Sequence, residues 1–178
     1  MISESQYWKS DLRKNLEFIF NKLDQKVWRT ASFVALEKKL MLSSYIVRKL
    51  FESNKISEEL YEKPIRLYSY KTKGIPVGVL NSHKIEQLYE IDTPQQMTKN
   101  LSYVLNQIIH SYIFTFTFES KNSIHGIIFN SDKSKRKVLY MLPLQDFLDA
   151  LFPIADFYIS KSICEINEHG ELVVVSSE

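Results

Sequence analysis

The chain has 178 residues, of which 44% are hydrophobic and 25% are charged, a composition typical of a folded globular protein. Only 4 Gly and 5 Pro are present, which leaves little room for long irregular loops. The formal net charge of +2 is too small for a protein that binds nucleic acid over its whole surface, so any such contact must come from a local basic patch.

One cysteine is present, Cys164, which excludes a disulfide within the chain and a zinc site built from several cysteines. We therefore expect a reducing compartment. The first residues show no apolar segment after a basic stretch, as a signal peptide would. No run approaches the roughly 20 apolar residues that span a bilayer. These patterns predict a cytoplasmic protein that does not associate with membranes.

The first part of the chain has the spacing of amphipathic helices. Residues 5–23 repeat apolar side chains at steps of three and four, which predicts a helix with one buried face. Residues 29–53 continue this spacing over a longer stretch, and the small Ser44 marks a place where two helices can approach closely. Because only a short link joins the two helices, we expect them to pack as a hairpin.

The pattern changes around Pro64. A short helical turn is expected at 57–62, and residues 64–71 alternate in polarity as a strand with one wetter face does. A turn should follow, and then a short helix capped by Asn81 or Ser82.

A third long helix is expected after this turn, because its start signal is well formed. Thr93 suits the N-cap position, Pro94 the first helical position, and Gln96 stands three residues after Thr93, as in a capping box. Apolar residues then recur on one face of this helix as far as Tyr112.

From residue 112 onward the apolar period is two. Three strands are expected, at 112–120, 123–130 and 137–142. Their links are too short for anything but antiparallel neighbours, so they form a meander.

The C-terminal part should hold one more helix, over 144–152 after Pro143, and a final hairpin of strands at 157–166 and 171–177. Helices come first and strands follow, which favours an α+β fold over a βαβ fold. We expect one domain, 1–178, that is helix-rich over 1–111 and strand-rich over 112–178. In it, a helical hairpin and a third long helix pack on an antiparallel sheet.

Asn106 and His110 are the most suggestive polar pair. They are four residues apart and therefore stack on one side of the third helix, opposite its apolar face. An imidazole in such a polar setting can act as an acid or a base near neutral pH. The alternative is a surface or interface histidine that is hydrogen-bonded to Asn106 or to a neighbouring element.

The segment from Leu105 to His110 resembles the helix motif of the HEPN ribonucleases of bacterial toxin and phage-defence systems. That motif has an Arg, often followed by a polar residue such as Asn, and a His four to six positions after the Arg. In this chain Asn106 and His110 fit the frame, but Leu105 replaces the Arg, and the resemblance covers about six residues. It implies RNA cleavage, with a cation from another helix standing in for the Arg. Arg48, Arg29 and Arg13 are the candidates, and Arg48 is also open to a salt-bridge role.

A basic turn is expected between the second and third strands of the meander. Its cations are Lys133, Lys135, Arg136 and Lys137. Such a tip can contact phosphates, and nearby aromatic rings can stack on bases. The alternative is a solvated turn whose lysines discourage aggregation between sheet edges. The four histidines lack the spacing of metal ligands, so neither a metal nor another cofactor is implied.

Three functional classes remain open. The preferred one is a small intracellular accessory or regulatory module, which works through a protein partner or as a homo-oligomer. The chain as a whole also resembles small bacterial proteins, and this resemblance implies a bacterial origin. Alternating phenylalanines and threonines from Phe114 to Phe118 support the preferred class, since a sheet with its Phe side on the helices leaves the Thr115–Thr117 side open. The alternatives are a HEPN-like or other His-dependent ribonuclease, and a protein that binds nucleic acid through the basic turn without cleaving it.

Overall fold

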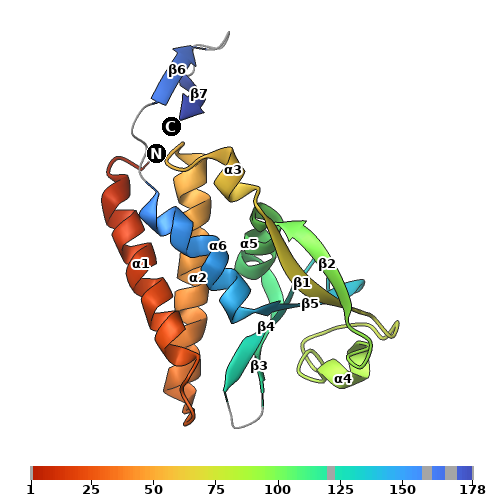
Figure 1. Ribbon diagram of the computed structural model, residues 1–178. Helices are drawn as coiled ribbons and strands as arrows, with labels where there is room; N and C mark the ends of the chain where they lie inside the picture. Colours follow the sequence, from red (N-terminus) through yellow and green to blue (C-terminus); the bar gives the residue numbers. More distant parts are fainter. Residues whose placement is uncertain (1, 120–122, 158–161, 167–171, 178) are drawn as a thin grey trace.

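The computed structural model describes residues 2–119, 123–157, 162–166 and 172–177; for the last two ranges only the backbone is described. The fold is α+β, with the longer helices on one side of a sheet (Figure 1). The helices are α1 (Ser5–Lys22), α2 (Thr30–Glu52), α3 (Glu58–Tyr61), α4 (Ile85–Leu88), α5 (Leu101–Ile109) and α6 (Leu144–Asp156). The strands are β1 (Pro64–Lys71), β2 (Gln95–Asn100), β3 (Ser111–Phe118), β4 (Ile124–Ser131), β5 (Val138–Pro143), β6 (Ser162–Ile166) and β7 (Leu172–Ser177).

The predicted helical hairpin is confirmed: α1 and α2 run side by side along the molecule (Figure 1). Their apolar stripes are fully buried at Leu12 and Leu16 of α1 and at Leu36 and Leu40 of α2, which explains the spacing of three and four. Ser44 is also fully buried and donates its hydroxyl to the carbonyl of Leu40. Helix α6 lies against α1 and extends the helical layer.

The sheet has five strands in the order β2-β1-β5-β4-β3, and every neighbouring pair is antiparallel. The meander β3-β4-β5 is therefore confirmed, and β1 joins it beside β5. On the helix side, Leu67, Phe129 and Leu142 enter the main core. Phe114 and Phe116 also pack against this core, as the alternation predicts.

The other side of the sheet is not as open as the alternation suggests. The connection between β1 and β2, which includes α4, folds back over it and forms a second apolar cluster with Tyr70, Leu88, Tyr89 and Leu139. Thr115 lies at the edge of the area that this connection covers, and it lines a pocket beside α4. The expectation of a flat open face is wrong over the part where this connection lies.

The third long helix is also shorter than predicted. Residues 95–100 form the edge strand β2, paired with β1 through contacts such as Leu67 opposite Met97, and α5 begins only at Leu101. Thr93 does not cap a helix; its hydroxyl bonds to the carbonyl of Glu90. The helix was predicted too long because Met97 stands four residues before Leu101, which is a helical spacing. Met97 packs against the core from the strand β2 instead.

The short helix α4 has no side-chain cap either: it begins at Ile85, and Asn81 closes a turn further back. The last two strands form the expected hairpin, but as a two-stranded sheet of their own. The turn predicted between them falls at 167–171, outside the described residues.

Candidate functional site

Helices α2 and α5 pack together and bring three polar side chains into contact. Arg48 on α2 places its Nη1 atom 3.3 Å from Oδ1 of Asn106 on α5. The same nitrogen lies 3.4 Å from Nε2 of His110, the C-cap residue that follows α5. Of the three arginines considered from the sequence, Arg48 is the one that reaches this pair. We call Arg48, Asn106 and His110 the Arg–Asn–His cluster.

The position that carries Arg in the HEPN motif is a core position here. Leu105 is fully buried, so a side chain at this place points away from Asn106 and His110. The guanidinium of the cluster comes instead from a different helix, 62 residues before His110. The arrangement places a cation beside the imidazole by tertiary packing.

Arg48 is held in place by an acid on its own helix. Its Nε donates to Oε1 of Glu52 at 2.8 Å, and Lys49 also binds this carboxylate. Hydrogen bonds from Lys49 and Arg48 hold the pKa of Glu52 below its ordinary value, so the carboxylate stays ionised at neutral pH. The Nε edge of the guanidinium is thereby fixed, and the Nη1 edge faces α5.

The cluster lines a cavity of about 690 Å³ between α2, α5 and the turn from β4 to β5. Its other lining residues are Gln107, Ile109, Ser111, Ser131, Asp132 and Lys133. The cavity therefore joins the helix motif and the basic turn, which the sequence presented as two separate candidate sites.

Gln107 fastens the basic turn to α5. Its side-chain oxygen accepts hydrogen bonds from the backbone N–H of Ser131 at 3.1 Å and from the hydroxyl of Ser134 at 2.8 Å. Sequence reasoning missed this residue. A polar side chain next to Asn106 at the border of the apolar face was the signal that could have indicated a contact with another element.

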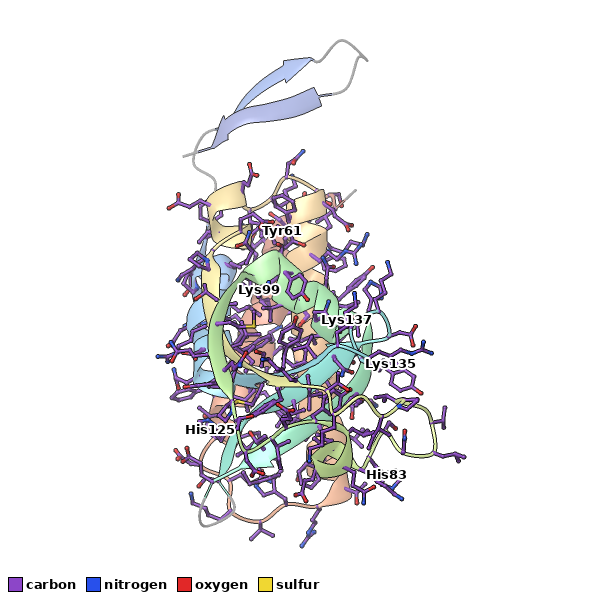
Figure 2. The ribbon with its side chains drawn as sticks, turned by 90° about the vertical axis from the view of Figure 1, so that its right-hand side faces the viewer. Tyr61, His83, Lys99, His125, Lys135 and Lys137 are labelled. Atoms are coloured by element: carbon purple, nitrogen blue, oxygen red, sulfur yellow. The ribbon has the colours of Figure 1, made fainter. Side chains whose placement is uncertain are left out.

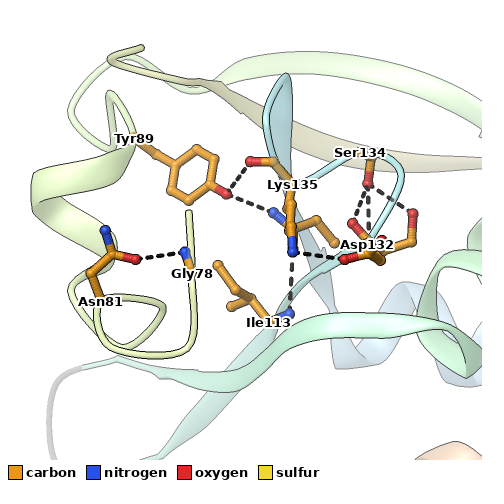
Figure 3. Close-up of polar contacts among 9 residues, drawn as sticks. Gly78, Asn81, Tyr89, Ile113, Asp132, Ser134 and Lys135 are labelled. Atoms are coloured by element: carbon orange, nitrogen blue, oxygen red, sulfur yellow. Dashed lines mark hydrogen bonds and ion pairs between the residues drawn. The ribbon is translucent and has the colours of Figure 1, made fainter. Parts of the chain in front are cut away.

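The four cations of the basic turn have different surroundings. Lys133 borders the cavity, whereas Lys135 turns away and lies over the ring of Tyr112, with its nitrogen 3.4 Å from the ring centroid. Lys135 also binds Asp132 at 2.7 Å, which lowers the pKa of that carboxyl (Figure 3). Arg136 and Lys137 are exposed, and Lys135 and Lys137 lie at the same edge of the molecule (Figure 2).

A buried polar network supports the turn from behind. Asn130 is fully buried, and its Nδ2 atom donates to the hydroxyl of Tyr89 at 2.8 Å and to the carbonyl of Val138 at 3.1 Å. Tyr89 in turn donates to the carbonyl of Lys135 at 2.6 Å (Figure 3). Because buried polar groups are costly when unpaired, this network fixes the turn that carries Lys133.

The remaining histidines lie elsewhere. His83 is exposed beside α4, and His125 on β4 bonds to Glu119 at 2.9 Å; His169 is outside the described residues. Within the described ranges, no three or more His, Cys, Asp or Glu side chains are grouped so as to hold a metal ion. Among the same residues, no helix has the length and apolar character needed to cross a membrane.

In comparisons with known proteins, no family model, no curated protein and no solved structure matches this chain. The resemblance to the HEPN motif accordingly stays a prediction, and the functional argument starts from the geometry of the cavity.

Proposed function

We propose that this chain is a ribonuclease that cleaves single-stranded RNA in the cavity of the Arg–Asn–His cluster. The observation that carries the proposal is the approach of Arg48 to His110, with 3.4 Å between Nη1 and Nε2, in a cavity bordered by Lys133. A guanidinium binds phosphate oxygens with a fixed fork of donors, and an imidazole exchanges protons near neutral pH. Together they supply proton transfer and charge stabilisation, two contributions that can cleave a phosphodiester.

The proposed step uses the 2′-hydroxyl of the RNA as nucleophile. His110 accepts the hydroxyl proton while the oxygen attacks the adjacent phosphorus, and Arg48 and Lys133 bind the phosphate oxygens on which negative charge develops. The bond from phosphorus to the 5′-oxygen breaks, and this oxygen takes a proton from the imidazolium or from water. The products are a 2′,3′-cyclic phosphate and a 5′-hydroxyl end. Asn106 holds the guanidinium in position.

The test is cleavage of a fluorescent single-stranded RNA and of the same oligonucleotide with 2′-deoxy sugars. We expect RNA to be cleaved to 2′,3′-cyclic phosphate ends, detected by mass spectrometry, and the deoxy substrate to remain intact. His110→Ala should lower kcat by about 10²- to 10⁴-fold, the usual contribution of a general acid or base. Arg48→Ala should lower it by about 10²- to 10³-fold, as for the loss of one charge-stabilising donor.

Matched controls separate chemistry from folding. His83→Ala removes an exposed imidazole that does not line the cavity, and Arg66→Ala removes an exposed guanidinium on β1 that does not line it either. Both variants should leave kcat unchanged. Melting temperatures of all variants should stay within a few degrees of the wild type. Salt-sensitive RNA binding without cleavage would contradict the proposal and favour the non-cleaving basic-turn class.

A second candidate function, the accessory module that works as a homo-oligomer, is favoured by a different observation. A groove of about 520 Å³ between α1 and α2 is lined by Trp8 and Ile46 and by three exposed apolar side chains. Tyr7 is 73% exposed, Leu42 50% and Tyr45 43%. Asp11, Lys14, Asn15 and Lys39 also line this groove, and apolar surface with a polar rim is typical of interaction sites.

Light scattering over a range of protein concentrations tests this second function. We expect self-association that Leu42→Asp abolishes. A carboxylate buried in an apolar contact loses its hydration without gaining a partner, which makes the contact unfavourable. Ala31→Asp adds the same single negative charge at an exposed position near the start of the same helix and should leave the mass unchanged. A wild-type protein that is monomeric at all concentrations would exclude the homo-oligomer.

A further inference from the structure

Strand β3 is the last strand at one border of the five-stranded sheet. Its pairing with β4 is regular from Ile113 to Thr117, between two bulges. The N–H of Ile113 points toward β4, where it donates to Oδ1 of Asn130 at 3.3 Å (Figure 3). Because successive residues of an antiparallel strand direct their N–H and C=O groups to opposite sides, Phe114 and Phe116 direct theirs outward. Each of these two residues therefore offers one donor and one acceptor to a further strand.

The two borders of the sheet differ in their protection against such pairing. The border strand β2 on the opposite side has the polar sequence QQMTKN and carries Lys99. Charged side chains and prolines are usual means by which native proteins keep sheet edges from pairing. Strand β3 has 8 residues, SYIFTFTF, without a charge or a proline. This composition leaves the edge of β3 open to pairing.

A groove runs along the outer edge of β3. Four successive residues of the strand, 112–115, line a pocket of about 280 Å³. Since successive side chains of a strand point to opposite faces, one pocket touches four residues in a row only where it lies beside the strand's edge. The opposite wall consists of Ser82, His83 and Ile85, from the connection between β1 and β2. The unpaired backbone thus faces a groove with a side wall.

A larger pocket of about 590 Å³ continues the groove and shares His83, Ile85 and Thr115 with the first pocket. Much of its lining is apolar or aromatic: Tyr70, Ile85, Ile91, Phe116 and Ile128. Lys84 and Glu86 also line it and bring one charge of each sign. Charge therefore does not select what enters the groove, whereas a large apolar side chain suits the lining.

We propose that β3 pairs with an extended, uncharged segment of a protein partner whose apolar side chains stand at alternate positions. The backbone groups of Phe114 and Phe116 then find the partners that a strand supplies, and alternate side chains of the segment enter the two pockets in succession. A nucleic-acid strand is a poorer match, because the lysine and the glutamate of the groove cancel and give phosphates no net attraction. A second copy that pairs through its own β3 presents Thr115 and Thr117 on the pocket side, which are small for the larger pocket.

A displayed library of short random peptides, presented to the folded full-length chain, is the first part of the test. We expect enrichment of peptides with large apolar residues two positions apart and few charges. Synthetic copies should bind one-to-one in calorimetry, with an affinity that does not change when the salt concentration is raised. A library without binders, or binders that depend strongly on salt, would overturn the proposal.

Amide exchange in the wild type, measured by NMR with and without such a peptide, locates the bound segment. The amides of Phe114 and Phe116 should exchange at least about 10-fold more slowly with peptide, whereas that of Thr115, which faces β4, should not change. Protection only elsewhere, such as in the groove between α1 and α2, would contradict pairing at β3. Protection of the same two amides without peptide, as the protein concentration rises, would show that a second copy is the occupant.

A charge at the groove provides a matched pair of variants. Thr115→Lys should weaken peptide binding by about 10-fold or more, because an ammonium group in the contact loses hydration. The control Thr98→Lys places the same charge at an exposed position of the opposite border strand and should bind as the wild type does. Equal affinity of the two variants would overturn the proposal. The groove and the cavity of the Arg–Asn–His cluster share no residue, so RNA cleavage by the same samples reports separately on the ribonuclease proposal.

Discussion

Tyr140 shows how a single buried side chain ties stability to pH. Its hydroxyl lies 2.8 Å from that of Tyr103, at the contact between β5 and α5, and the residue is 4% exposed. Burial is the first cause that raises the pKa of its phenol well above the ordinary value, and the bond to Tyr103 adds to it. Burial also raises the pKa of Tyr89 in the polar network behind the basic turn.

This shift predicts a loss of stability in alkali. Because the folded-state pKa of Tyr140 lies above the unfolded value of about 10, its contribution is complete below that pH and is lost as the pH rises further. We expect the melting temperature of the wild type to fall above about pH 10, and to fall less steeply in Tyr140→Phe. Melting curves from pH 8 to 11.5 check this, and parallel slopes for the two proteins would show that Tyr140 does not contribute.

At the scale of elements, predictions held where one periodicity ran over many residues. The long apolar stripes predicted the helices α1 and α2, and the alternation predicted the strands β3 to β5; the structure contains all five elements. The failure is β2, whose short polar sequence QQMTKN has no strand signal of its own. It becomes a strand because β1 offers an edge to pair with, and this tertiary effect cannot be seen in a local window.

The edge position of β2 can be tested by hydrogen exchange. A strand that pairs on one side leaves alternate N–H groups open to solvent, so alternate amides of Gln95–Asn100 should exchange rapidly and those between them slowly. A helix over the same residues would protect the successive amides after its first turn. Residue-resolved exchange measured by NMR distinguishes the two patterns, and continuous protection would contradict the strand.

At the scale of the whole molecule, the hairpin β6–β7 is not part of the five-stranded sheet. It forms its own two-stranded sheet, whereas the main core is closed by α6. An isolated two-stranded hairpin adds little stability in water. We therefore predict that a chain ending after Phe157 melts within about 3 °C of the full-length protein, as followed by circular dichroism. A much lower melting temperature would show that the hairpin supports the core.

The candidate site was only partly predictable from the sequence, because tertiary packing decides which of its residues meet. Asn106 and His110 lie close in sequence, so helical geometry alone placed them on one face. Arg48 was one of three possible arginines, and only the packing of α2 on α5 selects it. The link from Gln107 to the basic turn spans 24 residues to Ser131 and had no local signal that specified its partner.

Division of the Arg–Asn–His cluster between two helices has a consequence for the newly made chain. His110 and Arg48 meet only after α2 has docked on α5, so a nascent or partly unfolded molecule has the imidazole without the guanidinium. A ribonuclease built this way would cleave RNA about 10²- to 10³-fold more slowly until α2 and α5 have docked. Docking of α2 on α5 would then be the folding step that completes the proposed active site.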